Sequence, residues 1–142
     1  MKYSHRLSDA IHVLTYIGVS DSNTDLSSRA IAGSIDSNPS LVRRLMAALS
    51  NAGLINSNQG KISLELSRPA KDISLLDVYQ AIKEPELLHV DPKTNLKCIV
   101  GANIQKTLAS AYSKIQHKAE QEMDHISIQE IVDGILTENK NS

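Results

Sequence analysis

Two adjacent arginines, Arg43 and Arg44, follow the polar segment Asn38-Pro39-Ser40 in a chain of 142 residues. Asparagine followed by proline predicts a helix start, because proline at the first helical position lacks only a donor that would have no partner there. The N-terminal end of such a helix presents free N–H groups to phosphate and is the part of a recognition helix that reads the major groove. DNA is therefore the leading candidate partner. The alternative is that the two arginines are solvated charges on a surface helix.

A preceding helix favours DNA over solvated charges. Ser27 can cap a helix whose inner face holds Ile31 and Ile35, while the small side chain of Ala32 lets the next helix approach closely. Residues 28–45 thus fit the spacing of a helix-turn-helix. Asp36 stands in the turn, where many such motifs have glycine, but aspartate also tolerates left-handed backbone.

The segment after the second helix predicts a small wing. Gly53 ends the helix, and candidate strands follow at 54–55 and 62–66, with alternation in the second that predicts burial of Ile62, Leu64 and Leu66. Turn-forming residues fill positions 56–60 between them. Gln59 and Lys61 would then meet a phosphate or a minor-groove edge, although an exposed hairpin lysine equally serves solubility alone.

Further helices flank this motif. Ser4 precedes an amphipathic pattern that predicts a first helix, and Ser74 with Asp77 forms a capping box for a helix that Pro85 stops. Residues 85–100 contain two prolines and no clear periodicity, so they are interpreted as a linking loop. The predicted division is a winged helix-turn-helix region at 1–84, this loop at 85–100, and a long dimerisation helix with a short C-terminal helix at 101–142.

The long helix is predicted from apolar residues spaced three or four positions apart, which form a narrow seam along one side. Such a seam needs a partner. Packing within the chain is the alternative, but a helix-turn-helix protein that reads a palindrome needs two copies, which favours a homodimer. The predicted interface consists of Ile104, Leu108, Ala111, Ile115, Ala119 and Met123. A second capping box, Ser127 with Glu130, predicts the final helix, and 137–142 is expected to be a frayed tail.

Charge is unevenly distributed along the chain. Residues 1–71 contain eight Lys or Arg against five acidic residues, whereas the remainder contains seven against eleven. Every arginine lies in the first half, and arginine suits bidentate contacts with phosphate and guanine, so one end of the molecule is expected to face DNA. The predicted DNA-contacting residues are Arg6, Arg29, Ser37, Asn38, Ser40, Arg43, Arg44, Gln59 and Lys61.

Composition restricts the remaining possibilities. No apolar run approaches the roughly 20 residues of a membrane helix, and no signal-peptide core is present, so a cytoplasmic protein with no membrane partner is expected. Phe and Trp are absent, which leaves no evident stacking platform for single strands. Cys98 is the only cysteine, which excludes an intrachain disulfide and a cluster held by cysteines of one chain.

Several segments together resemble the bacterial winged-helix regulators of the IscR/NsrR/CymR type, the Rrf-two family, and in particular its YwnA-like subgroup. The resemblance runs nearly end to end and implies a homodimeric transcription factor, most often a repressor, with recognition helices in successive major grooves. The segments that carry it are Tyr3-Ser4, Asn38-Pro39 to Arg43-Arg44, Ala52-Gly53-Leu54, Ile73-Ser74-Leu75-Leu76-Asp77-Val78 and Cys98-Ile99-Val100-Gly101.

Two departures from the family pattern limit what it implies. Cluster-binding members supply three cysteines near the start of the dimerisation helix, whereas this chain has only Cys98, so neither an iron–sulfur cluster nor another cofactor is expected. The wing keeps only Gly60 of the family's glycine-rich run. Cys98 is a redox-sensor candidate if it is exposed and its pKa is lowered, but the favoured interpretation is a small buried hydrophobe.

An enzyme is the competing class, and the sequence argues against it. No nucleophile–base pair or phosphate loop is present, and the five histidines do not form a metal-ligand spacing with Cys98. The leading hypothesis is a homodimeric repressor that reads a palindromic operator in the major groove and responds to a small molecule or an oxidant. The alternatives are a thiol- or metal-responsive sensor and a dimeric adaptor that does not bind DNA.

Overall fold

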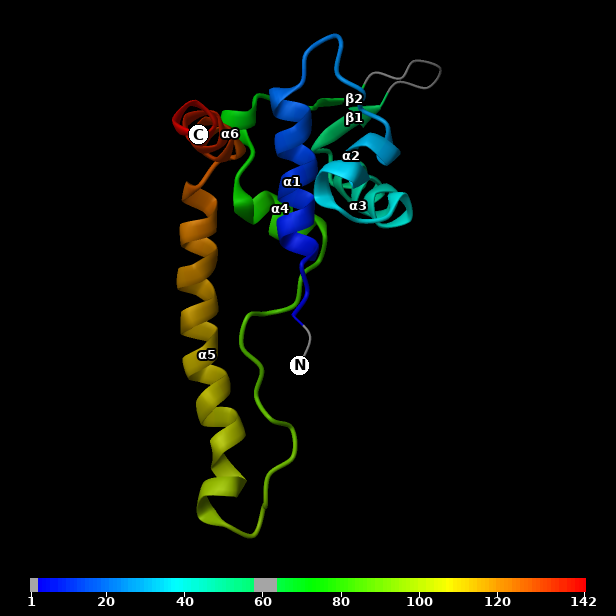
Figure 1. Cartoon of the computed structure of the whole chain (residues 1–142). Helices are drawn as coiled ribbons and strands as arrows, with labels where there is room; N and C mark the ends of the chain where they lie inside the picture. Colours follow the sequence, from blue (N-terminus) through cyan, green and yellow to red (C-terminus); the bar gives the residue numbers. More distant parts are fainter. Residues whose placement is uncertain (1–2, 58–63) are drawn as a thin grey trace. The chain divides into compact units, whose positions relative to one another are not determined.

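The computed structural model describes residues 3–57 and 64–142. The fold is mainly helical with a small antiparallel hairpin, which confirms the predicted class (Figure 1). The described helices and strands are α1 (Arg6–Val19), α2 (Ser28–Ile35), α3 (Pro39–Asn51), β1 (Ile55–Ser57), β2 (Leu64–Leu66), the 3-10 helix η1 (Ala70–Asp72), α4 (Leu75–Ala81), α5 (Ile99–His125) and α6 (Ile128–Asn141).

The chain forms two compact units. Met1–Glu84 and Asp124–Ser142 make the first unit, and Pro85–Met123 makes the second. The final helix α6 is therefore grouped with the first 84 residues, although most of α5 lies between them in the sequence. None of the helices in the described part of the chain is both long and apolar enough to cross a membrane.

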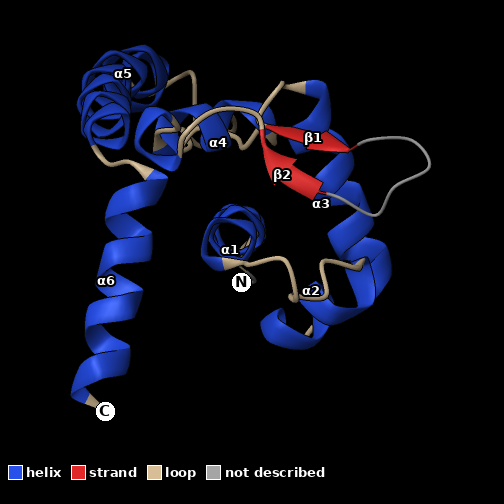
Figure 2. Ribbon diagram, turned by 90° about the horizontal axis from the view of Figure 1, so that it is seen from above, coloured by secondary structure: helices blue, strands red, loops and turns tan. Residues whose placement is uncertain are grey.

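The first unit is built around α1. Figure 2 shows α1 end-on, with α2 and α3 on one side and α6 on the other. The apolar residues of α1 recur every three or four positions, so one helix can fill the space between these neighbours. The largest fully buried side chains come from α1, α2, α3, α4, α6 and the segment before α4: Leu14, Ile31, Leu45, Leu49, Ile73, Ile128, Val13, Val42 and Val78.

The turn between α2 and α3 has the predicted geometry. The Ser27 side chain accepts a hydrogen bond from the Ala30 N–H (3.1 Å), and Asn38 Oδ1 accepts one from the Leu41 N–H (2.9 Å). Asp36 adopts the left-handed conformation with φ 62°, which lets the Ser37 N–H reach back to the Ala32 carbonyl oxygen. The predicted caps of both helices are confirmed, and aspartate does serve where glycine is common.

The hairpin begins immediately after α3. Gly53 has φ +76°, a conformation that glycine adopts without strain, and the Leu54 N–H then bonds the Leu49 carbonyl oxygen at 2.9 Å. Ile55 pairs with Leu66 and Ser57 with Leu64. Leu64 and Leu66 are partly buried against the core and Glu65 between them is exposed, as the alternation predicts. The predicted wing tip, with Gln59, Lys61 and Ile62, lies outside the described residues.

The N-terminal ends of α4 and α6 are tied together. Ser74 and Asp77 form the predicted capping box, and Ser127 caps α6 by accepting from the Glu130 N–H. Ser74 and Ser127 also form an antiparallel bridge, in which the Leu75 N–H bonds the Ile126 carbonyl and the Ile128 N–H bonds the Ile73 carbonyl. The expectation of a frayed tail after residue 136 is wrong, because α6 continues to Asn141.

The second unit contains an extended segment and the long helix α5. The Leu87 N–H donates to Gln116 Oε1 (2.9 Å), and Gln105 donates to Thr94 Oγ1 (2.8 Å), so side-chain hydrogen bonds hold the segment to the helix. The helix starts at Ile99, two residues before the predicted start. A Cβ added at Gly101 would collide with the main-chain oxygen of Asn95, so this turn requires glycine.

Candidate DNA-binding site

The polar face of α3 carries the residues that the sequence singles out. Arg43 Nη2 donates to Ser40 Oγ (3.2 Å), and Arg43 Nη1 lies 3.5 Å from Ser28 Oγ at the start of α2. Hydroxyl groups from both helices of the motif therefore orient one exposed guanidinium. Because a guanidinium has five N–H donors, the remaining donors stay free for a base edge or a phosphate.

The other predicted contacts around this helix fall into two groups. Arg29, Ser40 and Arg44 are exposed, and neither Arg29 nor Arg44 forms an ion pair within the described residues. Ser37 and Asn38 have structural partners, since the Ser37 N–H bonds Ala32 and Asn38 caps α3. The structure thus places the free cations on the surface and shows that two of the polar residues also build the motif.

Arg6 lies near α3 although it belongs to α1. It lines a shallow hollow of about 330 Å³ together with Leu41, Arg44 and Leu45. Its guanidinium lies 3.5 Å from a carboxylate oxygen of Glu84, and 47% of the Arg6 side chain is exposed. The sequence predicts Arg6 as a DNA contact but does not predict Glu84 as its partner, because the two residues lie 78 positions apart.

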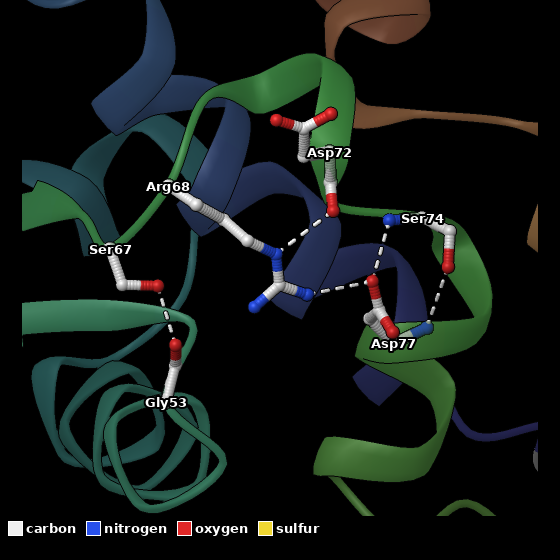
Figure 3. Close-up of polar contacts among 6 residues, drawn as sticks. All are labelled: Gly53, Ser67, Arg68, Asp72, Ser74 and Asp77. Carbon is white, nitrogen blue, oxygen red and sulfur yellow. Dashed lines mark hydrogen bonds and ion pairs between the residues drawn. The ribbon is translucent and has the colours of Figure 1, made fainter.

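Arg68 has a different role from the other arginines. Figure 3 shows its guanidinium between the Asp72 main-chain oxygen and the Asp77 carboxylate, with both contacts at 2.9 Å. The same Asp77 oxygen accepts from the Ser74 N–H in the α4 capping box. Arg68, which is not among the predicted DNA contacts, therefore joins the end of the hairpin to α4.

The predicted dimer residues lie along α5. Ala111 and Ile115 are exposed, with Ile115 at 49%, and Ile104, Leu108, Ala119 and Met123 are half-buried. The described residues of one chain therefore leave the middle of the seam open.

Cys98 lies just before α5. Its thiol is exposed, so the favoured prediction of a buried cysteine is wrong. Hydrogen bonds from the main-chain N–H groups of Gly101 and then Val100 lower the pKa of the Cys98 thiol, because both donors stabilise the thiolate. The two conditions for a reactive thiol, an exposed side chain and a lowered pKa, are therefore both met.

The fold and these contacts define a class. A helix-turn-helix followed by a two-stranded hairpin, with cations at the N-terminal half of the second helix, is the architecture of a winged-helix DNA-binding protein.

Residues 3–134 match the family model described as Rrf2, Iron-dependent Transcriptional regulator, and the chain belongs to this family. It is a DNA-binding transcription regulator and not an enzyme, as the sequence predicts.

Known relatives agree with this assignment. The chain is 36% identical over 132 residues to a Bacillus subtilis (strain 168) protein named "Putative HTH-type transcriptional regulator YwnA", covering 92% of this chain and 97% of YwnA. It also shares its fold with CymR (YrzC), the global cysteine regulator of B. subtilis, at 15% identity and a TM-score of 0.67, covering 94% and 97% of the two chains. T. potens IscR matches at 19% identity and a TM-score of 0.69, covering 95% and 88%.

The family is described as iron-dependent, so the side chains that could bind iron are relevant. Among the described residues no group of three or more His, Cys, Asp or Glu side chains is placed to hold a metal ion. Residues 1–2 and 58–63 contain none of these four residue types. A single cysteine cannot supply the thiolates that hold an iron–sulfur cluster. The residues of this chain therefore do not fit a resident iron site.

Proposed function

We propose that this regulator is a cytoplasmic homodimeric repressor that reads a palindromic operator with the N-terminal half of α3. The observation that carries the proposal is the placement of Arg43, which Ser28 and Ser40 orient from the two helices of the motif. Arg29, Arg44 and Arg6 supply further cations around it for phosphate contacts. Lys61, outside the described residues, is proposed to add a sequence-independent contact.

The test is an electrophoretic mobility shift on the operator and on unrelated duplex DNA. Arg43→Ala should cost about 1–3 kcal/mol on the operator and relax base preference, because a bidentate base contact is lost. Lys61→Ala should weaken both DNAs alike. Lys140→Ala, which removes a positive charge from α6, is the matched control. Full operator affinity in Arg43→Ala would exclude this recognition-helix assignment.

Support for the dimer comes from the open seam on α5. A repressor with one recognition helix per chain needs a second copy to read both halves of a palindrome. The exposed Ile115 and Ala111 offer apolar surface on a helix of 27 residues, which suits pairing with the same surface of another chain.

Thiol regulation through Cys98 is a second candidate, favoured by its exposure and lowered pKa. The thiolate would attack one oxygen of hydrogen peroxide and break the O–O bond, which gives a sulfenic acid and hydroxide, and the hydroxide takes a proton from solvent to form water. Peroxide should then change operator affinity in the wild type and leave Cys98→Ser unchanged. Equal responses from both proteins would exclude Cys98 as the sensor.

A further inference from the structure

A groove with Arg6 at its centre runs along one side of α3. The hollow that Arg6 shares with Arg44 has a neighbour of about 460 Å³, which Arg6 lines together with Asn51, Gln80 and Lys83. Three cations and two amides line the two hollows together with apolar side chains, and no acidic residue lines either one. This chemistry suits a phosphodiester, which presents only acceptor oxygens and a negative charge.

Glu84 provides the negative charge next to this groove. Only 12% of its side chain is exposed, and one carboxylate oxygen meets both Arg6 Nη1 and Ser4 Oγ at 3.5 Å. The Glu84 N–H bonds the Tyr79 carbonyl oxygen, which fixes the main chain of Glu84 to the end of α4. The acid is thus held in place, while Arg6 keeps about half of its side chain open to an incoming anion.

We propose that Glu84 occupies Arg6 in the free protein and that a DNA phosphate replaces it on binding. The inference rests on the proposed DNA-binding function and assigns Arg6, Arg44 and Lys83 to the phosphates beside the recognition helix. Glu84 is then a positioning residue for Arg6, and it limits affinity for any DNA sequence. Both contacts to its oxygen are 3.5 Å long and Arg6 is half-exposed, which favours exchange on the arginine side, while the phosphate contacts must offset the loss of a partner for the mostly buried Glu84 carboxylate.

Glu84→Gln is the direct test, because it keeps the size of the side chain and removes the charge. Fluorescence anisotropy with a labelled random-sequence duplex should show binding about two- to tenfold tighter than wild type at low salt, because Arg6 is released and a negative charge near phosphate is removed. The tightening should shrink as salt rises. In an Arg6→Ala background, the change in log Kd caused by Glu84→Gln should be at most half of the change in the wild-type background.

The matched control is Glu86→Gln, which removes an exposed acid two residues away and should leave affinity unchanged. Unaltered or weaker binding by folded Glu84→Gln would overturn the inference, as would equal tightening in the wild-type and Arg6→Ala backgrounds. Should Glu84→Gln fail to fold by circular dichroism, Glu84→Asp retracts the carboxylate and is judged by the same criteria. A wild-type protein that binds no duplex at low salt would overturn the proposed function itself.

Discussion

The two units differ in how far they bury their apolar side chains. The first unit buries apolar side chains from α1, α2, α3, α4 and α6 in one core. In the second unit, Leu96 is 72% exposed and Ile99 is 82% exposed, and the buried residue on α5 is the polar Gln116. The first unit is organised as a domain with its own core, whereas the second presents apolar surface that suits a partner.

The largest effect is expected in the core of the first unit. Leu45→Ala should lower the free energy of unfolding by about 2–5 kcal/mol, because it leaves a cavity among well-packed side chains. Ile99→Ala, in the exposed start of α5, should change it by less than about 0.5 kcal/mol. Urea denaturation followed by circular dichroism measures both. Equal losses of unfolding free energy in the two variants would contradict the proposed difference in burial between the units.

A charge on the open seam should break the proposed dimer without unfolding the first unit. Ile115→Glu should weaken association by about 2–4 kcal/mol, because a carboxylate without a partner would enter the interface. Ser113→Glu places the same charge on another side of α5 and should leave the dimer intact. Size-exclusion chromatography with light scattering reads out the mass. A dimeric Ile115→Glu protein would place the interface elsewhere.

Within the first unit, Arg68 is expected to contribute to stability and Arg44 to DNA binding. Arg68→Ala should cost about 1–2 kcal/mol of stability, because two charge-assisted hydrogen bonds at the base of the hairpin are lost from a partly exposed site. Arg44→Ala should leave the melting temperature unchanged and weaken DNA binding. Thermal denaturation and a binding titration on both variants check this. A loss of stability in Arg44→Ala but not in Arg68→Ala would contradict these two roles.

The smallest effect concerns the pH at which Cys98 reacts. The N–H groups of Gly101 and Val100 lower the pKa of this thiol, so its thiolate should form at lower pH than that of an ordinary cysteine. The pH profile of iodoacetamide alkylation, followed by mass spectrometry, should have its midpoint below that of a free cysteine peptide. A midpoint at or above the peptide value would contradict the hydrogen bonds at the start of α5.

The local elements of the fold were predictable from the sequence. The caps at Ser27, Asn38 and Ser74 involve partners three residues away, so the residues that define them are adjacent in the printed chain. The same holds for Arg43, which lies one helical turn from Ser40. Signals of this kind need no knowledge of how distant segments meet.

The long-range contacts were not predictable in the same way. Glu84 reaches Arg6 only because the ends of α1 and α4 meet, and a salt bridge leaves no periodic pattern in the sequence. Arg68 looked like the other arginines, yet its partners are set by the path of the chain after the hairpin. The exposure of Cys98 likewise depends on the turn that precedes α5.

The bridge between Ser74 and Ser127 has a consequence for how the protein is made. It joins α4 to α6, and α6 also packs against α1, more than 100 residues earlier in the sequence. A ribosome must therefore release nearly the whole chain before the N-terminal part can bury all of its apolar face. A nascent chain stalled within α5 would expose the side of α1 that α6 covers, and would present chaperones with a complete helix-turn-helix on an incomplete core.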